Sequence, residues 1–296
     1  MHFLPNVAVR RPDRSKSHVL SSGRMLAWSE WGEEAAIPVL FLTGAGMAGT
    51  LGFGIDHLQE LNVRLIAPDR PGLGQSDPDP DKTLSSVADD VIELLGHLQV
   101  QEAAVAAFSQ GAPFALALAA KGVVSRLAIV SGQDDLAKKV FDQLLPEQVR
   151  QMTRQAASDP EGFLAMLEGF AEPDGFFELV LSMSSEPDRS VYGQEPFRSA
   201  YKLALAEGFR QGPGGYARDT LAALGPWDIN LAAINCPMTL WYGGKDASPV
   251  HSPDFGASLA QCLKTAERRF FPEEGGALLW TRARDILREL VGKEVL

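Results

Sequence analysis

The stretch from Ala103 to Ala120 constrains this chain more than any other. It begins with an apolar run (AAVAAF) that ends at Phe108, turns on Ser-Gln-Gly, and continues as an Ala- and Leu-rich segment. A short apolar run that ends in a turn is typical of a buried strand, and Ala and Leu favour a helix. The pattern therefore predicts a strand, a tight turn with Ser109 at its apex, and a helix.

A serine at such a turn has a special environment. The sharp turn lifts the hydroxyl above the sheet, and the following helix directs its N–H groups and its positive dipole end toward it. Ala107, two residues before the serine, is small enough for the strand and helix backbones to approach closely, although Gly is commoner there. Ala-x-Ser-x-Gly in this context favours a nucleophilic serine. The alternative is an ordinary connection in which Ser109 is a helix N-cap.

Strand and helix patterns alternate along much of the chain. We predict a β-hairpin over 17–31 and buried strands over 38–43, 63–68, 126–131, 237–242 and 266–271, with helices from about Thr83 and over 278–291. Such alternation requires right-handed crossovers into a mostly parallel sheet flanked by helices. Residues 133–233 contain only amphipathic helical patterns. We therefore expect an α/β core formed by residues 1–132 and 234–296, with an inserted helical cap at 133–233.

Composition excludes some partners. With 296 residues, 45% of them apolar, the chain can bury a sizeable core, and its net charge of −11 disfavours nucleic acid and anionic membranes. No apolar run reaches about 18 residues, and the first residues lack a secretory pattern, so we expect a cytoplasmic protein. Cys236 and Cys262 have no metal-ligand spacing, and we expect core positions for both. The oligomeric state is not predicted.

Four segments together carry a family resemblance. They are Phe41–Gly46 after a strand, the DRPGLGQSD run at 69–77, the turn at Ser109, and Gly-Gly-Lys-Asp at 243–246. Their order and spacing resemble those of the α/β-hydrolase superfamily, and the cap resembles that of small-cap, proline-iminopeptidase-like members. The resemblance implies the α/β-hydrolase fold and hydrolysis of a small acyl ester or amide, with no metal and no organic cofactor.

The resemblance also implies roles for individual residues. Ser109 is the nucleophile, and the N–H of Gln110 is one oxyanion donor because it follows the nucleophile. The second donor is the N–H of Ala45 in the glycine-rich loop, where small residues allow close approach of the backbone. A tight strand exit is the alternative for that loop. Asp246, which closes Gly-x-x-Asp, is the acid that orients the histidine, with a helix N-cap as the alternative.

The triad histidine is absent from its usual place. The loop after the last strand reads PEEGGALL, and Gly276 occupies the position of the family's general base. Removing the base of a Ser-His-Asp triad lowers turnover by about 10⁶-fold in the best-studied protease, so activity is in doubt. On this interpretation, replacing Gly276 by His raises the rate of ester hydrolysis.

Three explanations for the missing histidine stay open. The chain is a natural non-catalytic member, a variant from which the histidine was removed, or an enzyme whose base comes from elsewhere. His2, His18, His57 and His97 are all expected to lie far from Ser109, and His251 is the candidate for a relocated base. The sequence alone does not choose among these explanations.

The partner is expected to be a small acyl substrate or an apolar ligand. A non-catalytic pseudo-hydrolase that binds such a ligand is the alternative function. We predict that glycine-loop and aromatic residues line the pocket between cap and sheet. These residues are Gly44, Gly46, Phe108, Phe163, Phe170 and Trp227. For Phe163, Phe170 and Trp227, packing inside the cap is the alternative.

Overall fold

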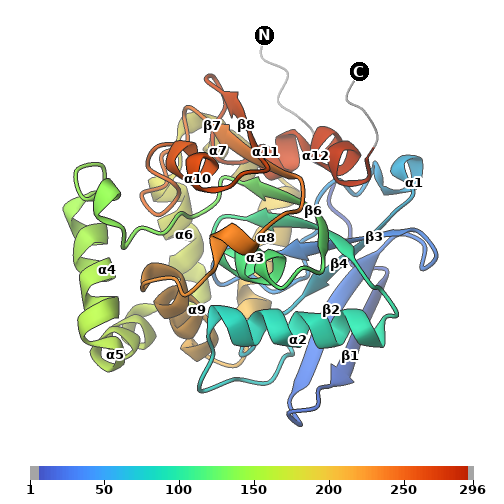
Figure 1. Cartoon of the computed structure of the whole chain (residues 1–296), viewed down its shortest axis with the longest axis horizontal. Helices are drawn as coiled ribbons and strands as arrows, with labels where there is room; N and C mark the ends of the chain where they lie inside the picture. The colour runs from blue at the N-terminus through green and yellow to red at the C-terminus, as the bar shows by residue number, and fades with distance from the viewer. Residues whose placement is uncertain (1–6, 293–296) are drawn as a thin grey trace.

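The computed structural model describes residues 7–292, and a single sheet lies at its centre (Figure 1). The strands of this sheet are β1 (Arg14–Val19), β2 (Met25–Trp31), β3 (Ile37–Leu42), β4 (Val63–Pro68), β5 (Ala103–Phe108), β6 (Val124–Val130), β7 (Met238–Gly243) and β8 (Ala266–Phe271). Their spatial order is β1-β2-β4-β3-β5-β6-β7-β8. The hairpin β1–β2 is antiparallel and also pairs antiparallel with β4, whereas all pairs from β4 to β8 are parallel. The predicted α/β-hydrolase fold is confirmed.

Helices cover both faces of this sheet, as parallel strands require. The core helices are α1 (Leu58–Leu61), α2 (Leu84–His97), α3 (Gly111–Ala120), α10 (Ala257–Cys262), α11 (Leu278–Thr281) and α12 (Ala283–Leu290). Helices α2, α3 and α10 bury their apolar residues on one face, while α1, α11 and α12 pack on the other. Helix α2 starts as expected, because Thr83 and Ser86 form a reciprocal capping box.

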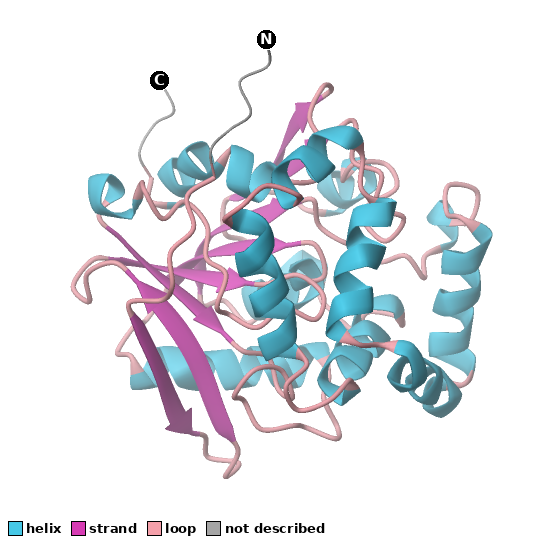
Figure 2. Ribbon diagram, turned by 180° about the vertical axis from the view of Figure 1, so that it is seen from behind, coloured by secondary structure: helices cyan, strands magenta, loops and turns pink. Residues whose placement is uncertain are grey.

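The chain between β6 and β7 forms the cap. It contains α4 (Glu147–Ser158), α5 (Pro160–Phe170), α6 (Pro173–Met183), α7 (Glu186–Tyr192), α8 (Phe197–Gly208) and α9 (Gly214–Leu224), with short 3-10 helices η1 (Lys139–Phe141) and η2 (Leu231–Ala233) on either side. Figure 2 shows these helices gathered beside the sheet, with α4 and α5 farthest from it in Figure 1. The segment between β6 and β7 thus adds helices beside the sheet and no strand to it.

Three local expectations need comment. The predicted helix 278–291 is divided at Arg282 into α11 and α12. Cys262 is exposed at the end of α10, so its expected core position is wrong, and Cys236 is only partly buried. Among residues 7–292, no helix combines the length and the apolar character that crossing a bilayer demands.

Candidate active site

The turn after β5 holds Ser109 in a strained conformation. Its φ is +52°, a left-handed value that is uncommon for a residue with a side chain. Its N–H donates to the carbonyl of Val130, and its carbonyl accepts from the N–H groups of Ala112 and Gln133. Gly111 is required two residues later, because a Cβ atom there would lie 2.3 Å from the carbonyl oxygen of Leu42. The turn therefore presents the Ser109 hydroxyl in a fixed direction.

One imidazole bridges Ser109 and Asp246. The Nε2 atom of His251 lies 2.9 Å from Ser109 Oγ, and its Nδ1 atom lies 2.7 Å from Asp246 Oδ2. The other carboxylate oxygen of Asp246 accepts from the N–H of Ser248 at 3.0 Å. The side chains of His251 and Asp246 are 11% and 5% exposed, so both hydrogen bonds are largely shielded from water.

The carboxylate fixes the tautomer of His251. Because an ionised carboxylate only accepts hydrogen bonds, Nδ1 of His251 carries the proton that faces Asp246. In the neutral ring, Nε2 then has a free lone pair and accepts from the Ser109 hydroxyl. This is the arrangement in which a histidine can remove the serine proton during attack.

The segment after β6 connects the nucleophile to the loop that carries His251. The N–H of Gln133 donates to the Ser109 carbonyl at 3.0 Å, and the carbonyl of Gly132 accepts from the N–H of Ser252 at 2.9 Å. The Ser252 hydroxyl lies 3.2 Å from the carboxylate of Asp134. Burial raises the pKa of Asp134 to about 6. Adjacent residues of one segment therefore hold both partners of the Ser109–His251 hydrogen bond.

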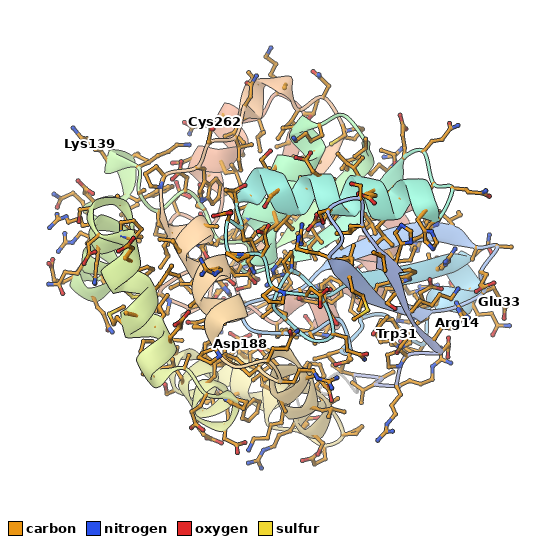
Figure 3. The ribbon with its side chains drawn as sticks, turned by 90° about the horizontal axis from the view of Figure 1, so that it is seen from below. Arg14, Trp31, Glu33, Lys139, Asp188 and Cys262 are labelled. Atoms are coloured by element: carbon orange, nitrogen blue, oxygen red, sulfur yellow. The ribbon has the colours of Figure 1, made fainter. Side chains whose placement is uncertain are left out.

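Gly276 lies beside the Asp246 carboxylate, and the structure leaves no room for a side chain at this position. A Cβ atom on Gly276 would lie 2.9 Å from the Asp246 carboxylate, so any side chain there would displace it. The N–H groups of Gly276 and Ala277 donate to Asp188 of α7, at 2.9 and 2.8 Å. Figure 3 shows Asp188 in the interior, while Lys139 and Cys262 lie at the periphery. Burial raises the pKa of Asp188, partly offset by those two donors.

Although position 276 carries no histidine, Ser109 has an imidazole within hydrogen-bond distance. It belongs to His251, in the loop after β7, five residues beyond Asp246. Of the explanations left open, the relocated base matches the geometry. Of the other histidines, His18 and His97 stack on each other, His57 lies directly before α1, and His2 is outside the described residues.

The two residues expected to supply oxyanion donors are near Ser109 in the structure. Ala45 lines the same cavity as Ser109, and Gln110 follows Ser109 at the start of α3. Neither backbone N–H has a hydrogen-bond acceptor within residues 7–292. The Gln110 side chain donates to the Thr220 hydroxyl of α9 at 3.1 Å, so it is directed away from the nucleophile. Both N–H groups are therefore without a protein acceptor in the described part of the chain.

A buried ion cluster supports the loop that contains Ala45. The guanidinium of Arg70 donates to the carbonyls of Thr43 and Gly44, at 2.7 and 2.9 Å, and to Asp219 of α9 at 2.8 Å. Lys82 pairs with the same Asp219 at 2.7 Å, and all three charged side chains are at most 1% exposed. The cluster joins the glycine loop to the cap.

Cap and core enclose a cavity of about 80 Å³ above Ser109. Apolar side chains from both parts form most of its wall, and its polar lining includes the triad residues, Asp188 and two tyrosines. The lining residues used below are Phe108, Phe176, Met183, Asp188, Tyr192 and Tyr201. Asp188, Tyr192 and Tyr201 escaped the sequence analysis because they lie within ordinary amphipathic helices, where no motif marks them.

Of the predicted pocket residues, only Phe108 lines this cavity. Phe163 is fully buried among the cap helices, Phe170 is 52% exposed, and Trp227 packs on the far face of the sheet. Gly44 and Gly46 are not among the lining residues, and a Cβ atom on them would meet the rings of Phe108 and Phe209 respectively. The prediction is therefore wrong for these five residues. That a residue is aromatic does not show whether it lies in the packed core or in the cavity wall.

The cavity is electronegative. Asp188 and Asp246 both line it, and no Lys or Arg side chain is among the described residues that do. A bound carboxylate or phosphate would meet like charges in a site with little water to screen them. The geometry is therefore suited to an uncharged molecule.

A family model matches most of the chain. The α/β hydrolase fold family model matches residues 37–248. The dihydrolipoyllysine-residue acetyltransferase component of the acetoin cleaving system of Pseudomonas putida is 27% identical over 274 residues, which cover 91% of this chain and 66% of that protein. An uncharacterized hydrolase of Bacillus subtilis is 32% identical over 82 residues, which cover 28% of this chain and 29% of that protein. The chain thus spans less than two thirds of either curated relative.

Solved structures show the same fold over nearly the whole chain. A hydrolase from Pseudomonas aeruginosa PA01 superposes with a TM-score of 0.69 and 18% identity, covering 95% of this chain and 99% of that one. The enol-lactonase from Burkholderia xenovorans LB400 gives a TM-score of 0.66 and 19% identity, with coverage of 93% and 98%. With the fold and the family match in agreement, the chain belongs to the α/β hydrolase fold family.

Proposed function

We propose that this protein is a serine hydrolase that cleaves small, uncharged carboxylic esters. Ser109 is the nucleophile, His251 the general base and Asp246 the residue that orients the imidazole. The observation that carries the proposal is the His251 bridge, with 2.9 Å to Ser109 Oγ and 2.7 Å to Asp246 Oδ2. These separations are within hydrogen-bond reach, which a base needs in order to take the serine proton.

Acylation follows from this geometry. Ser109 Oγ forms a bond to the ester carbonyl carbon while its proton passes to Nε2 of His251. The carbonyl oxygen becomes an oxyanion, which the N–H groups of Ala45 and Gln110 stabilise. The tetrahedral intermediate then collapses, the bond to the alcohol oxygen breaks, and His251 returns the proton to the departing alcohol.

Deacylation uses the same residues in reverse. Water attacks the acyl group on Ser109 and gives a proton to Nε2 of His251. When the second tetrahedral intermediate collapses, Ser109 leaves as the alcohol with that proton, and the carboxylic acid is released. Asp246 stays ionised throughout and stabilises the imidazolium that forms in each half of the cycle.

The cavity restricts the acyl group. At about 80 Å³ it is far smaller than the ~300–1,000 Å³ of sites for drug-sized ligands. Together with Asp188 and Asp246 in the wall, the volume favours short, uncharged acyl chains.

The test is hydrolysis of p-nitrophenyl acetate by the wild type and by Ser109→Ala. We expect Ser109-dependent turnover, since the variant lacks the nucleophile, and a wild-type mass increase at Ser109 with an alkyl fluorophosphonate. Hydrolysis that survives in Ser109→Ala would contradict the proposal. Wild-type hydrolysis at the buffer rate, without labelling, would support the ligand-binding alternative instead.

A further inference from the structure

Two tyrosine hydroxyls in the cavity wall have no protein partner. Tyr192 ends α7 and Tyr201 lies in α8, each is only 4% exposed, and both line the cavity with Ser109. Within residues 7–292, neither phenol oxygen makes a hydrogen bond, and neither is completely enclosed by protein atoms. Both residues line the cavity, which is where a ligand could reach this open surface. Nearly buried hydroxyls usually find a partner, so this pair needs an explanation.

The rings that carry these hydroxyls are firmly packed. Tyr192 and Tyr201 contact each other edge to face, with centroids 5.5 Å apart. Trp280 packs against both rings, at 6.0 and 6.3 Å, and Phe197 also contacts both. Edge-to-face packing on several sides fixes the orientation of a ring. The two hydroxyls are therefore positioned before any ligand arrives.

The charge of the cavity selects what these hydroxyls can bind. Burial raises the pKa of both phenols, so they stay protonated at neutral pH and are able to donate. Asp188 lies one turn before Tyr192 on α7, and Asp246 is in the same cavity. Their negative charges disfavour an anionic acceptor, which leaves an uncharged oxygen as the acceptor that fits.

We propose that Tyr192 and Tyr201 determine specificity by donating hydrogen bonds to an uncharged ether or ketone oxygen in the acyl chain of the substrate. This inference rests on the proposed function and narrows its substrate class to short oxygenated acyl esters. The acyl chain is the relevant part because it stays bound to Ser109 after the alcohol leaves. A purely hydrocarbon chain would leave both hydroxyls unpaired, and sites built to hydrogen-bond a ligand discriminate strongly for that reason.

A pair of nearly isosteric substrates tests this inference. p-Nitrophenyl methoxyacetate and p-nitrophenyl butyrate differ in one position, where an ether oxygen replaces a methylene group. For each enzyme the ratio of kcat/KM values is divided by the ratio of the hydroxide-catalysed rates, which removes intrinsic reactivity. We expect the wild type to prefer the methoxyacetate, and each of Tyr192→Phe and Tyr201→Phe to lower the corrected ratio about 3- to 10-fold, as the loss of one hydrogen bond predicts.

Tyr216→Phe is the matched control. Tyr216 is a buried tyrosine of α9 that packs against Phe176 and Phe209 but does not line the cavity, so its removal should leave the corrected ratio unchanged. An equal ratio in the wild type and in the Tyr192→Phe/Tyr201→Phe double variant would overturn the inference even if ester hydrolysis depends on Ser109.

A binding measurement separates this inference from catalysis. In the Ser109→Ala background, NMR titration with 2-methoxyacetamide and with butyramide compares the same two acyl chains without turnover. We expect tighter binding of the methoxyacetamide, with the difference lost when Tyr192 and Tyr201 are both Phe. Equal affinities for the two amides would overturn the inference. A different result, wild-type hydrolysis that does not require Ser109, would contradict the proposed function itself.

Discussion

Two loops at the carboxyl edge of the sheet differ in what they supply to the site. The loop after β7 carries both Asp246 and His251, and it is held by Gly132 and Asp134 of the segment after β6. The loop after β8 also lies beside this carboxylate, but it contributes the backbone of Gly276 and is bonded to the cap through Asp188. An imidazole can thus reach Ser109 and the acid from the loop after β7 instead of from the loop after the last strand.

The largest effect is expected at the base itself. His251→Ala should lower kcat for p-nitrophenyl acetate by roughly 10⁴- to 10⁶-fold, because the serine proton then has no acceptor. KM should change little, since the base acts mainly in the transition state. Steady-state kinetics measure both values. The Ser109→Ala/His251→Ala double variant should be no slower than either single variant, as expected for residues that act as one unit.

Moving the histidine tests whether the two loops are interchangeable. We expect His251→Ala/Gly276→His to stay as slow as His251→Ala, because a Cβ atom at position 276 would displace the Asp246 carboxylate. This reverses the expectation that Gly276→His raises the rate. Recovery of more than about 100-fold would mean that the loop after β8 still accepts a working base, and the contrast between the loops would then be one of sequence only.

A smaller effect is expected when only a methyl group is added beside the acid. Gly276→Ala should lower kcat by about 10- to 100-fold, because displacing Asp246 misorients the imidazole. It should also destabilise the fold by about 1–3 kcal/mol, as overpacking does. Kinetics and urea unfolding measure the two effects.

Gly96→Ala provides the control for that change. Gly96 lies in α2, where a Cβ atom would contact nothing, so Ala should stabilise by up to ~1 kcal/mol and leave kcat unchanged. If Gly276→Ala leaves kcat unchanged and does not destabilise the fold, a side chain at position 276 does not displace Asp246.

The last prediction concerns stability alone, with no expected change in kcat, and involves Asp134, which supports the loop after β7. Because the pKa of Asp134 is raised to about 6, the folded protein retains a proton between about pH 4 and 6 that the unfolded chain releases. The contribution of this group to stability is therefore full below pH 4 and is lost as the pH rises through 6. Asp134→Asn should remove that loss. Its free energy of unfolding at pH 7 should exceed that of the wild type by up to about 3 kcal/mol.

Urea unfolding at pH 4, 5, 6 and 7 checks this prediction. The difference in stability between the variant and the wild type should grow with pH up to about 6 and change little between pH 6 and 7. Asp69, whose pKa burial also raises to about 6, is unchanged in both proteins and cancels in the difference. A difference that does not depend on pH would show that Asp134 is ionised in the folded protein at pH 4.

The sequence predicted the parts of the site that depend on local backbone chemistry. Strand, turn and glycine at Ser109, and the loop position of Asp246, follow from short motifs whose conformations are set within a few residues. His251 was only one open alternative, because its distance to Ser109 depends on how a loop folds back across the sheet edge. The cavity lining could not be predicted. Helical periodicity indicates that Phe163 is buried, but it does not show which residues it packs against.

The ion cluster of Arg70, Lys82 and Asp219 determines which part of the cap can move when a ligand arrives. Separating Arg70 from Asp219 would leave an uncompensated charge in the interior, at a cost of about 3–5 kcal/mol. Gln110 and Gln133 hold α9 as well, through Thr220 and the carbonyl of Ala223. The end of the cap at α9 is therefore part of the rigid frame. The wall formed by α6 and α7 has no buried charge pair among the described residues, and α7 is held to the core by the N–H groups of Gly276 and Ala277, which donate to Asp188.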